Sequence, residues 1–162
     1  MTEQLILDRL TTDLESLLDE TFRTVHGHYL DKHTSLFETL ATISAEEASQ
    51  PVGDRCATLA AQVNHIRVYI EVLERYMRGE EVGPTDWAAS WRVSGVDDAE
   101  WESLKERLDV AYESMRATMQ GGTTWDGAEA ISGALAILVH TAYHLGEIRQ
   151  ALCVLGASTA RP

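Results

Sequence analysis

Hydrophobic residues recur at intervals of three or four along most of the chain, which is the period of an amphipathic helix. The first stripe lies over about residues 3–25 and consists of Leu7, Leu10, Leu14, Leu18, Phe22 and Val25. Similar stretches cover about residues 54–79, 97–121 and 127–155. Four helices of this length can bury one another's apolar faces, so the pattern predicts an all-α fold, a four-helix bundle.

Capping signals predict where these helices begin and end. Asp54 is a plausible N-cap of the second long helix, and Asp97-x-x-Glu100 forms a capping box at the start of the third. Ser44-x-x-Glu47 is a second capping box, expected to start a short helical turn before Pro51. Gly156 is expected to end the last helix. We therefore expect one domain over residues 1–156 and a loose tail over 157–162.

The connections between the long helices differ in length. The third and fourth helices are joined by about seven residues and should be antiparallel neighbours. The 1–2 connection is longer and contains an amphipathic piece with Leu36, Leu40 and Ile43 on one face. The 2–3 connection, residues 79–95, is long enough to run back along the bundle and make the second and third helices parallel. Spacing alone also permits a simple up-down bundle.

Charge and composition exclude several classes of partner. The 162 residues contain 13 Lys and Arg against 26 Asp and Glu, a net charge of −13, which disfavours binding to nucleic acid or to anionic membranes. The N-terminal segment MTEQLILDRL has no basic region or cleavage site, and no apolar run approaches the length of a membrane span. We therefore expect a soluble, cytoplasmic protein.

The last helix contains the candidate chemistry. It is apolar on all sides, which predicts burial on more than one side, and His140 and His144 lie four residues apart on one face. Glu147 continues the same line. A third metal ligand could come from His65, which is near the middle of its helix as the pair is near the middle of theirs. His65 lies about 120° from the main apolar stripe of its helix, so the alternative remains that these histidines are hydrogen-bonded core residues.

Three segments carry a resemblance to a known family. They are QVNHIRVYIEVLERYMRGE, DWAASW and HTAYHLGEIRQAL. The chain resembles the DinB/YfiT-like superfamily of bacterial metal-binding four-helix bundles over nearly its whole length. One histidine in the second helix and H-x-x-x-H in the fourth carry the similarity, here His65, His140 and His144. The resemblance implies a divalent metal ion, usually zinc or nickel, held by these three imidazoles. It also implies an up-down-down-up topology and frequent homodimers.

The resemblance also implies an activity. Relatives with assigned activity use small thiols such as mycothiol or bacillithiol, so we expect a metal-dependent enzyme acting on small molecules, a thiol transferase or a hydrolase. The alternatives are a non-catalytic, stress-associated protein that binds a metal or small ligand, and a structural dimer.

Glu147 could orient a ligand, take a proton or act as a fourth ligand; a surface carboxylate paired with Arg149 or another neighbour is the competing interpretation. If acid protonates the histidines, metal and ligand should be lost together below about pH 6. Surplus apolar surface on the second and fourth helices predicts a homodimer, unless residues 34–50 cover it.

The remaining candidates have simpler expected roles. A histidine cluster near the end of the first helix is expected to be solvated: His26, His28 and His33. Four aromatic residues in the connections are expected to cover the ends of the bundle rather than to line a pocket: Tyr29, Trp87, Trp91 and Trp125. Cys56 and Cys153 are expected to be buried, unpaired thiols.

Overall fold

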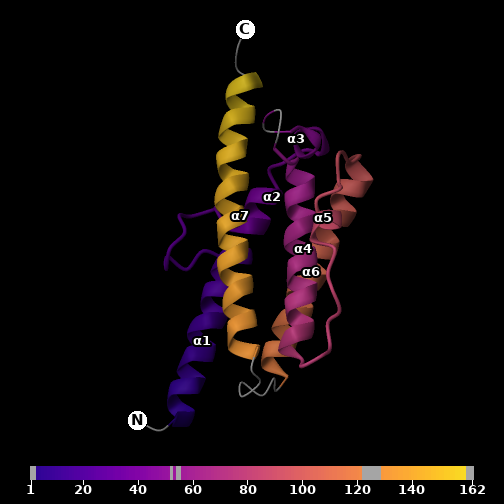
Figure 1. Cartoon of the computed structure of the whole chain (residues 1–162). Helices are drawn as coiled ribbons and strands as arrows, with labels where there is room; N and C mark the ends of the chain where they lie inside the picture. Colours follow the sequence, from indigo (N-terminus) through magenta and orange to yellow (C-terminus); the bar gives the residue numbers. More distant parts are fainter. Residues whose placement is uncertain (1–2, 52, 54–55, 122–128, 160–162) are drawn as a thin grey trace. The chain divides into compact units, whose positions relative to one another are not determined.

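The computed structural model describes residues 3–51, 53, 56–121 and 129–159, and no strand occurs among them. Their helices, labelled in Figure 1, are α1 (Glu3–Phe22), α2 (Leu36–Leu40), α3 (Ala45–Ser49), α4 (Leu59–Met77), α5 (Trp87–Ser90), α6 (Asp98–Gln120) and α7 (Ala130–Thr159). The all-α prediction is confirmed. None of these helices combines the length and hydropathy that crossing a membrane would require.

The chain divides into two compact units. Residues 1–42 contain α1 and α2, and residues 43–162 contain the other helices. The predicted single domain over residues 1–156 stays a prediction. All three candidate metal ligands belong to the second unit.

In the second unit α4 packs against both α6 and α7. Figure 1 shows α4 running opposite to α7 and in the same direction as α6, because the segment after α4 returns along that helix before α6 begins. The return path allowed by the length of residues 79–95 is therefore the one the chain takes. The core between these helices consists of buried residues that include Val63, Ile66, Ile70, Leu104, Leu108, Met115, Ile137, Leu145 and Ile148.

A buried carboxylate links α4 to α6. Glu74 is 4% exposed and accepts hydrogen bonds from Ser114 Oγ at 2.8 Å and Thr118 Oγ1 at 2.7 Å. Arg78, the residue that follows the end of α4, pairs with the same carboxylate. Since a buried charge is tolerated only when it is paired and hydrogen-bonded, this network fixes the register of the two parallel helices.

A glycine allows α7 to approach α4 closely. Gly133 is buried in the first turn of α7, and a Cβ built on it would lie 2.8 Å from Met77 Cγ. No side chain fits at that distance unless Met77 moves. This contact places the start of α7 against the end of α4, as in an antiparallel pair, so that the middles of the two helices face each other.

The start of α4 differs from the prediction. The helix begins after Thr58, whose Oγ1 accepts the N–H of Ala61 at 3.1 Å and donates to Val93 O at 2.8 Å. The second of these bonds comes from a segment 35 residues away, which local sequence signals cannot reveal. The predicted N-cap, Asp54, lies outside the described residues.

The end of α7 also differs from the prediction. The helix continues past Gly156 to Thr159, so three residues assigned to a loose tail are helical. Glycine is unfavourable in a helix by about 1 kcal/mol relative to alanine, which does not force a helix to end. Both capping boxes are confirmed, at Ser44–Glu47 and at Asp97–Glu100. The predicted start of this helix, Gly127, lies outside the described residues.

In the first unit, one carboxylate organises the loop after α1. Glu20 is fully buried and accepts four backbone N–H groups at 2.7–2.9 Å, from His26, His28, Tyr29 and Leu30. The chain turns through Gly27 at φ +85°, a conformation that favours glycine. The wrapped loop ends α1 at Phe22, three residues before the predicted boundary. Burial raises the pKa of Glu20, but the four N–H donors outweigh it and bring the pKa down to about 2.

Replacing Glu20 with glutamine is expected to open this loop. The amide keeps one acceptor oxygen and loses the charge, and hydrogen bonds to charged groups contribute about 1.5–3 kcal/mol each. Hydrogen exchange at the amides of residues 26–30 should therefore speed up strongly, whereas Glu106→Gln, an exposed carboxylate on α6, should leave it unchanged. Because the folded-state pKa is lowered from 4.5 to about 2, this contribution is present above pH 4.5 and disappears as the pH falls towards 2. Unchanged protection in Glu20→Gln would contradict this role.

Candidate metal centre

His65, His140 and His144 converge at the contact between α4 and α7. Each offers one ring nitrogen, and these three atoms lie within 4.8 Å of one another. The Nε2 atoms of His65 and His140 are 3.1 Å apart. Two nitrogens bound at about 2.0–2.1 Å to one tetrahedral ion lie about 3.3 Å apart. The three side chains are therefore close enough to bind one metal ion.

The ring of His65 is oriented by a hydroxyl group on α5. Ser90 Oγ donates to Trp87 O at 2.6 Å, and His65 Nδ1 lies 2.7 Å from the same oxygen. Since the hydroxyl proton is used on Trp87 O, Nδ1–H of His65 donates to Ser90. In the neutral ring Nε2 then carries the lone pair, on the side that faces His140. Asn64 Nδ2 also donates to Ser90 O at 2.7 Å and holds α5 against α4.

The ring of His144 is oriented in the same manner by Glu147. Its Nδ1 donates to Glu147 Oε2 at 2.7 Å, which leaves the lone pair of the neutral ring on Nε2. A carboxylate behind a metal-binding histidine fixes the tautomer and raises the basicity of the ligand. Glu147 therefore positions His144, and among the described residues its ion-pair partner is this histidine rather than Arg149. Tyr143 belongs to the same group, since its hydrogen bond to Glu147 and then the charge of that carboxylate raise its pKa.

The third ring, that of His140, is held by stacking. Its plane lies 6° from that of Tyr69, with ring centroids 3.6 Å apart. Its Nδ1 is buried and has no hydrogen-bond partner among the described residues. A buried polar atom without a partner costs free energy unless a ligand or water satisfies it. His140 is thus the least satisfied of the three when only protein atoms are counted.

Burial keeps two of the rings uncharged at neutral pH. Desolvation, with a smaller contribution from His144, lowers the pKa of His65 to about 4. Desolvation, followed by the charges of His144 and His65, lowers the pKa of His140 to about 3. Both rings therefore present lone pairs at pH 7, as metal binding requires. The expectation that protons compete below about pH 6 is corrected for these two ligands, since protons compete with the metal only in more acidic solution.

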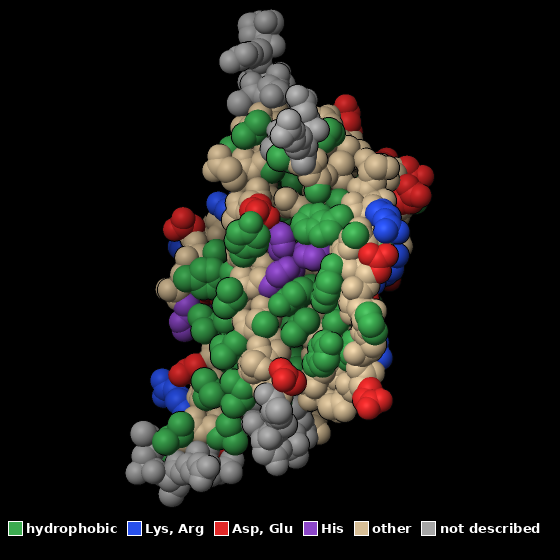
Figure 2. Space-filling view, in the orientation of Figure 1, with side chains coloured by type: hydrophobic (Ala, Val, Ile, Leu, Met, Phe, Trp, Pro, Cys, Tyr) green, Lys and Arg blue, Asp and Glu red, His purple; other side chains and the backbone are tan. Residues whose placement is uncertain are grey.

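Aromatic side chains surround the centre. Trp91 stacks on His65 with centroids 4.1 Å apart, and Trp87 meets the same ring edge-on at 6.2 Å. Figure 2 shows histidine side chains gathered on the α4–α7 part of one face, surrounded by hydrophobic side chains. The prediction that Trp87 and Trp91 cover the ends of the bundle is therefore wrong. Their spacing of four predicted only that the two tryptophans share one helical turn. They reach His65 because the connection between α4 and α6 returns past the middle of α4, which the spacing does not show.

The other candidate residues lie elsewhere. His26, His28 and His33 are exposed, as predicted, and belong to the first unit, where His26 contacts Asp19 and His28 contacts Ser16. The hydroxyl of Tyr29 lies 2.6 Å from Thr21 Oγ1 in that unit. Trp125 lies outside the described residues.

The cysteine prediction is half right. Cys56 and Cys153 are both unpaired, but both are exposed rather than buried. Cys153 follows Ala151 of the buried face by two residues, about 200° around the helix, which places it on the opposite side. Cys56 precedes α4 and never enters its apolar stripe.

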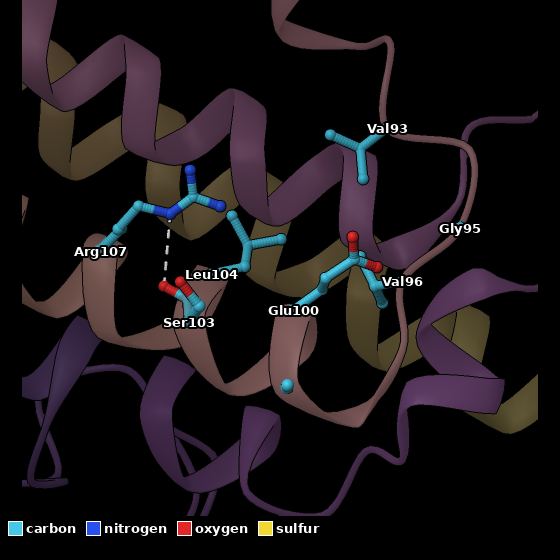
Figure 3. Close-up of a pocket in the computed structure, with 8 residues that line it drawn as sticks. Val93, Gly95, Val96, Glu100, Ser103, Leu104 and Arg107 are labelled. Atoms are coloured by element: carbon cyan, nitrogen blue, oxygen red, sulfur yellow. Dashed lines mark hydrogen bonds between the residues drawn. The ribbon is translucent and has the colours of Figure 1, made fainter.

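One pocket of the second unit is separate from the histidines. It has a volume of about 430 Å³ and lies between residues 93–96 and the first turns of α6 (Figure 3). Two of its polar groups are engaged in the helix itself, since Glu100 accepts from Asp97 N and Arg107 Nε donates to Ser103 O. None of the residues lining it is a histidine or a cysteine, so we assign the candidate site to the α4–α7 contact.

Removing the carboxylate behind His144 is expected to weaken metal binding without abolishing it. Glu147→Ala should lower the affinity about 10- to 100-fold, the usual effect of losing such a partner. Glu147→Gln should lower it less, because the amide oxygen still accepts from Nδ1. Chelator competition measures both values, with Glu106→Ala as the control. Wild-type affinity in Glu147→Ala would show that the carboxylate has no positioning role.

Comparisons with known proteins add no further assignment. No family model, curated protein or solved structure matches the chain. The resemblance to the DinB/YfiT-like superfamily therefore stays a prediction that depends on His65, His140 and His144 and on the sequence around them.

Proposed function

We propose that His65, His140 and His144 bind one divalent metal ion, zinc or nickel, and that the protein is a metal-dependent enzyme acting on small molecules, a thiol transferase or a hydrolase. The observation that carries the proposal is the convergence of three ring nitrogens within 4.8 Å. The hydrogen bonds of His65 and His144 support it. In each neutral ring Nδ1 donates to its partner, so the lone pair that a metal ion needs lies on Nε2.

The donor set determines what the site can do. His65, His140 and His144 would hold a divalent ion without compensating its charge, and the ion would supply a site that stabilises an anion such as a thiolate or hydroxide. The protein's own residues orient the histidine rings and cover part of them. Ser90 and Glu147 fix two rings, while Tyr69 and Trp91 cover the faces of His140 and His65. Glu147 acts through His144 and is a positioning residue rather than a catalytic one.

The proposed activity is tested by thiol conjugation. A small thiol displaces chloride from 1-chloro-2,4-dinitrobenzene: sulfur forms the new bond to the ring carbon, chloride leaves, and the thiol proton goes to solvent. We expect the zinc- or nickel-loaded chain to accelerate this reaction over the metal-free chain at equal concentration. If neither this reaction nor hydrolysis of activated esters depends on the metal, the enzymatic proposal fails.

The runner-up is a non-catalytic, stress-associated protein that binds a metal or small ligand. It shares the histidine site and differs only in turnover. Metal binding without acceleration of either reaction would favour this runner-up. The bacterial stress role and the up-down-down-up bundle completed by α1 remain proposals that depend on the resemblance. The cytoplasmic location remains a proposal that depends on the N-terminal sequence and the short apolar runs.

We also propose a homodimer formed through bundle helices. Leu135 and Val139, one turn apart on α7, are 41% and 65% exposed. These two residues form an apolar face of α7 that a second copy could cover, and α7 would then be buried on more than one side, as its sequence predicts. Sedimentation at micromolar concentration should give a dimer, and Val139→Glu should shift it towards monomer with unchanged helical content. A wild-type monomer would contradict the proposal.

A further inference from the structure

A groove beside the histidines has the properties of a ligand site. Its volume is about 460 Å³, within the range of pockets that bind small molecules. It lies between Cys56 and the first turn of α4, with Gln62, on one side and the middle of α7, with Tyr143, Gly146 and Glu147, on the other. Glu147 belongs both to this groove and to the metal centre, because it accepts the Nδ1–H of His144.

Gly146 has no packing reason to be glycine. A Cβ built on it would have no described atom within 4 Å outside its own helix and its chain neighbours. Glycine inside a helix is less favourable than alanine, and residues that break a local rule without a packing reason are often functional. Gly133 on the same helix is the opposite case, because its Cβ would meet Met77. The absence of a side chain at Gly146 therefore leaves space in the groove.

One residue of the groove wall has an unsatisfied acceptor. Gln62 Oε1 is buried and accepts no hydrogen bond from any described residue. A ligand with an N–H or O–H donor would satisfy it once the Gln62 side chain turns towards the groove. The lining residues include no lysine, arginine or histidine, and their one ionisable carboxylate is Glu147. A ligand that is neutral or cationic therefore fits better than an anion. Much of the remaining wall is apolar and includes Ala151 and Val154.

We propose that this groove binds the body of the substrate: a small, largely apolar, neutral or cationic molecule whose N–H or O–H group donates to Gln62. The inference rests on the proposed function only in calling the bound molecule a substrate, because none of the three histidines lines the groove. A ligand in the groove would contact Glu147, and Glu147 would pass any shift on to His144 and a metal ion bound there.

The test uses N-benzylacetamide as the ligand and NMR titration as the measurement. We expect a dissociation constant on the order of 1 mM, as for other ligands of this size, with shifts at Gly146 and Ala151. Benzyl acetate, which has the same shape without the N–H group, should bind about tenfold more weakly. Gln62→Leu should remove the difference between the two ligands.

Two glycine-to-leucine variants of α7 test the groove, one that fills it and one that does not. Gly146→Leu should weaken binding of N-benzylacetamide at least tenfold while keeping the metal, since Gly146 ligates nothing. Gly156→Leu, on the same helix and also at a position where a Cβ meets open space, should bind like the wild type. Equal affinity in Gly146→Leu and wild type, or no wild-type binding up to about 10 mM in metal-loaded protein, would overturn the inference. Absence of a wild-type response together with loss of a dimer in Gly146→Leu would assign the groove to a second copy and also overturn it. If the ligand binds but no metal does, the groove stands and the proposed function fails.

Discussion

His140→Ala is expected to abolish stoichiometric metal binding while the helical circular dichroism stays close to that of the wild type. His140 Nε2 lies 3.1 Å from His65 Nε2, so its removal takes away one of two nitrogens already placed for a shared ion. The loss of affinity should exceed the 10- to 100-fold expected from losing a supporting partner such as Glu147. The ring is only half-buried, so its removal should leave the packing of α7 on α4 largely intact.

Metal content by plasma mass spectrometry, after dialysis of protein without a histidine tag, measures this effect. His28→Ala is the matched control, because this histidine is exposed in the first unit and should not contribute a ligand. One equivalent of metal is expected in the wild type and in His28→Ala. Retention of a full equivalent in His140→Ala would remove His140 from the ligand set.

Small thiols are expected to change the ligand-field spectrum of the cobalt-loaded protein, and His144→Ala is expected to abolish the change. A thiol binds a metal as the thiolate, so binding releases a proton. The apparent affinity should therefore rise with pH until the free thiol itself ionises, near pH 8.5. Glu147→Gln should keep the spectral change at higher cobalt concentration, because it weakens the orientation of His144 without removing the ring.

The control for the thiol is the matching alcohol, which ionises far less readily and should leave the spectrum unchanged. A cobalt spectrum that stays indifferent to thiols between about pH 6 and pH 9 would refute thiol use. Water activation, and hence hydrolysis, would then be the better account of the same three histidines.

Local sequence signals predicted the helices well because periodicity and capping act over a few residues. The two capping boxes, at Ser44 and Asp97, are self-contained, since each pairs side chain and backbone within four positions. The start of α4 was missed because Thr58 is fixed partly by Val93, far away in sequence. The end of α7 was missed because a glycine permits a helix end without requiring one.

The convergence of the three histidines could be predicted, whereas the groups that support them could not. Spacing placed His140 and His144 on one face, and the heights of the helices matched His65 to them. The doubt raised by the position of His65 on its helix has a structural answer, since α4 packs against two neighbours and His65 points to the one that carries the pair. No sequence pattern marked Ser90 as a partner of His65, because Ser90 lies in a long connection whose path back along α4 the sequence does not determine.

X-ray absorption of the zinc- or nickel-loaded protein tests the central claim most directly. The account predicts a first shell that contains three imidazole nitrogens at about 2.0–2.2 Å, with the outer-shell scattering of three rings, and a drop to two rings in His65→Ala protein reloaded with excess metal. A first shell with sulfur near 2.3 Å, which would bring in Cys56 or Cys153, or a shell with fewer than three imidazoles in the wild type, would contradict it.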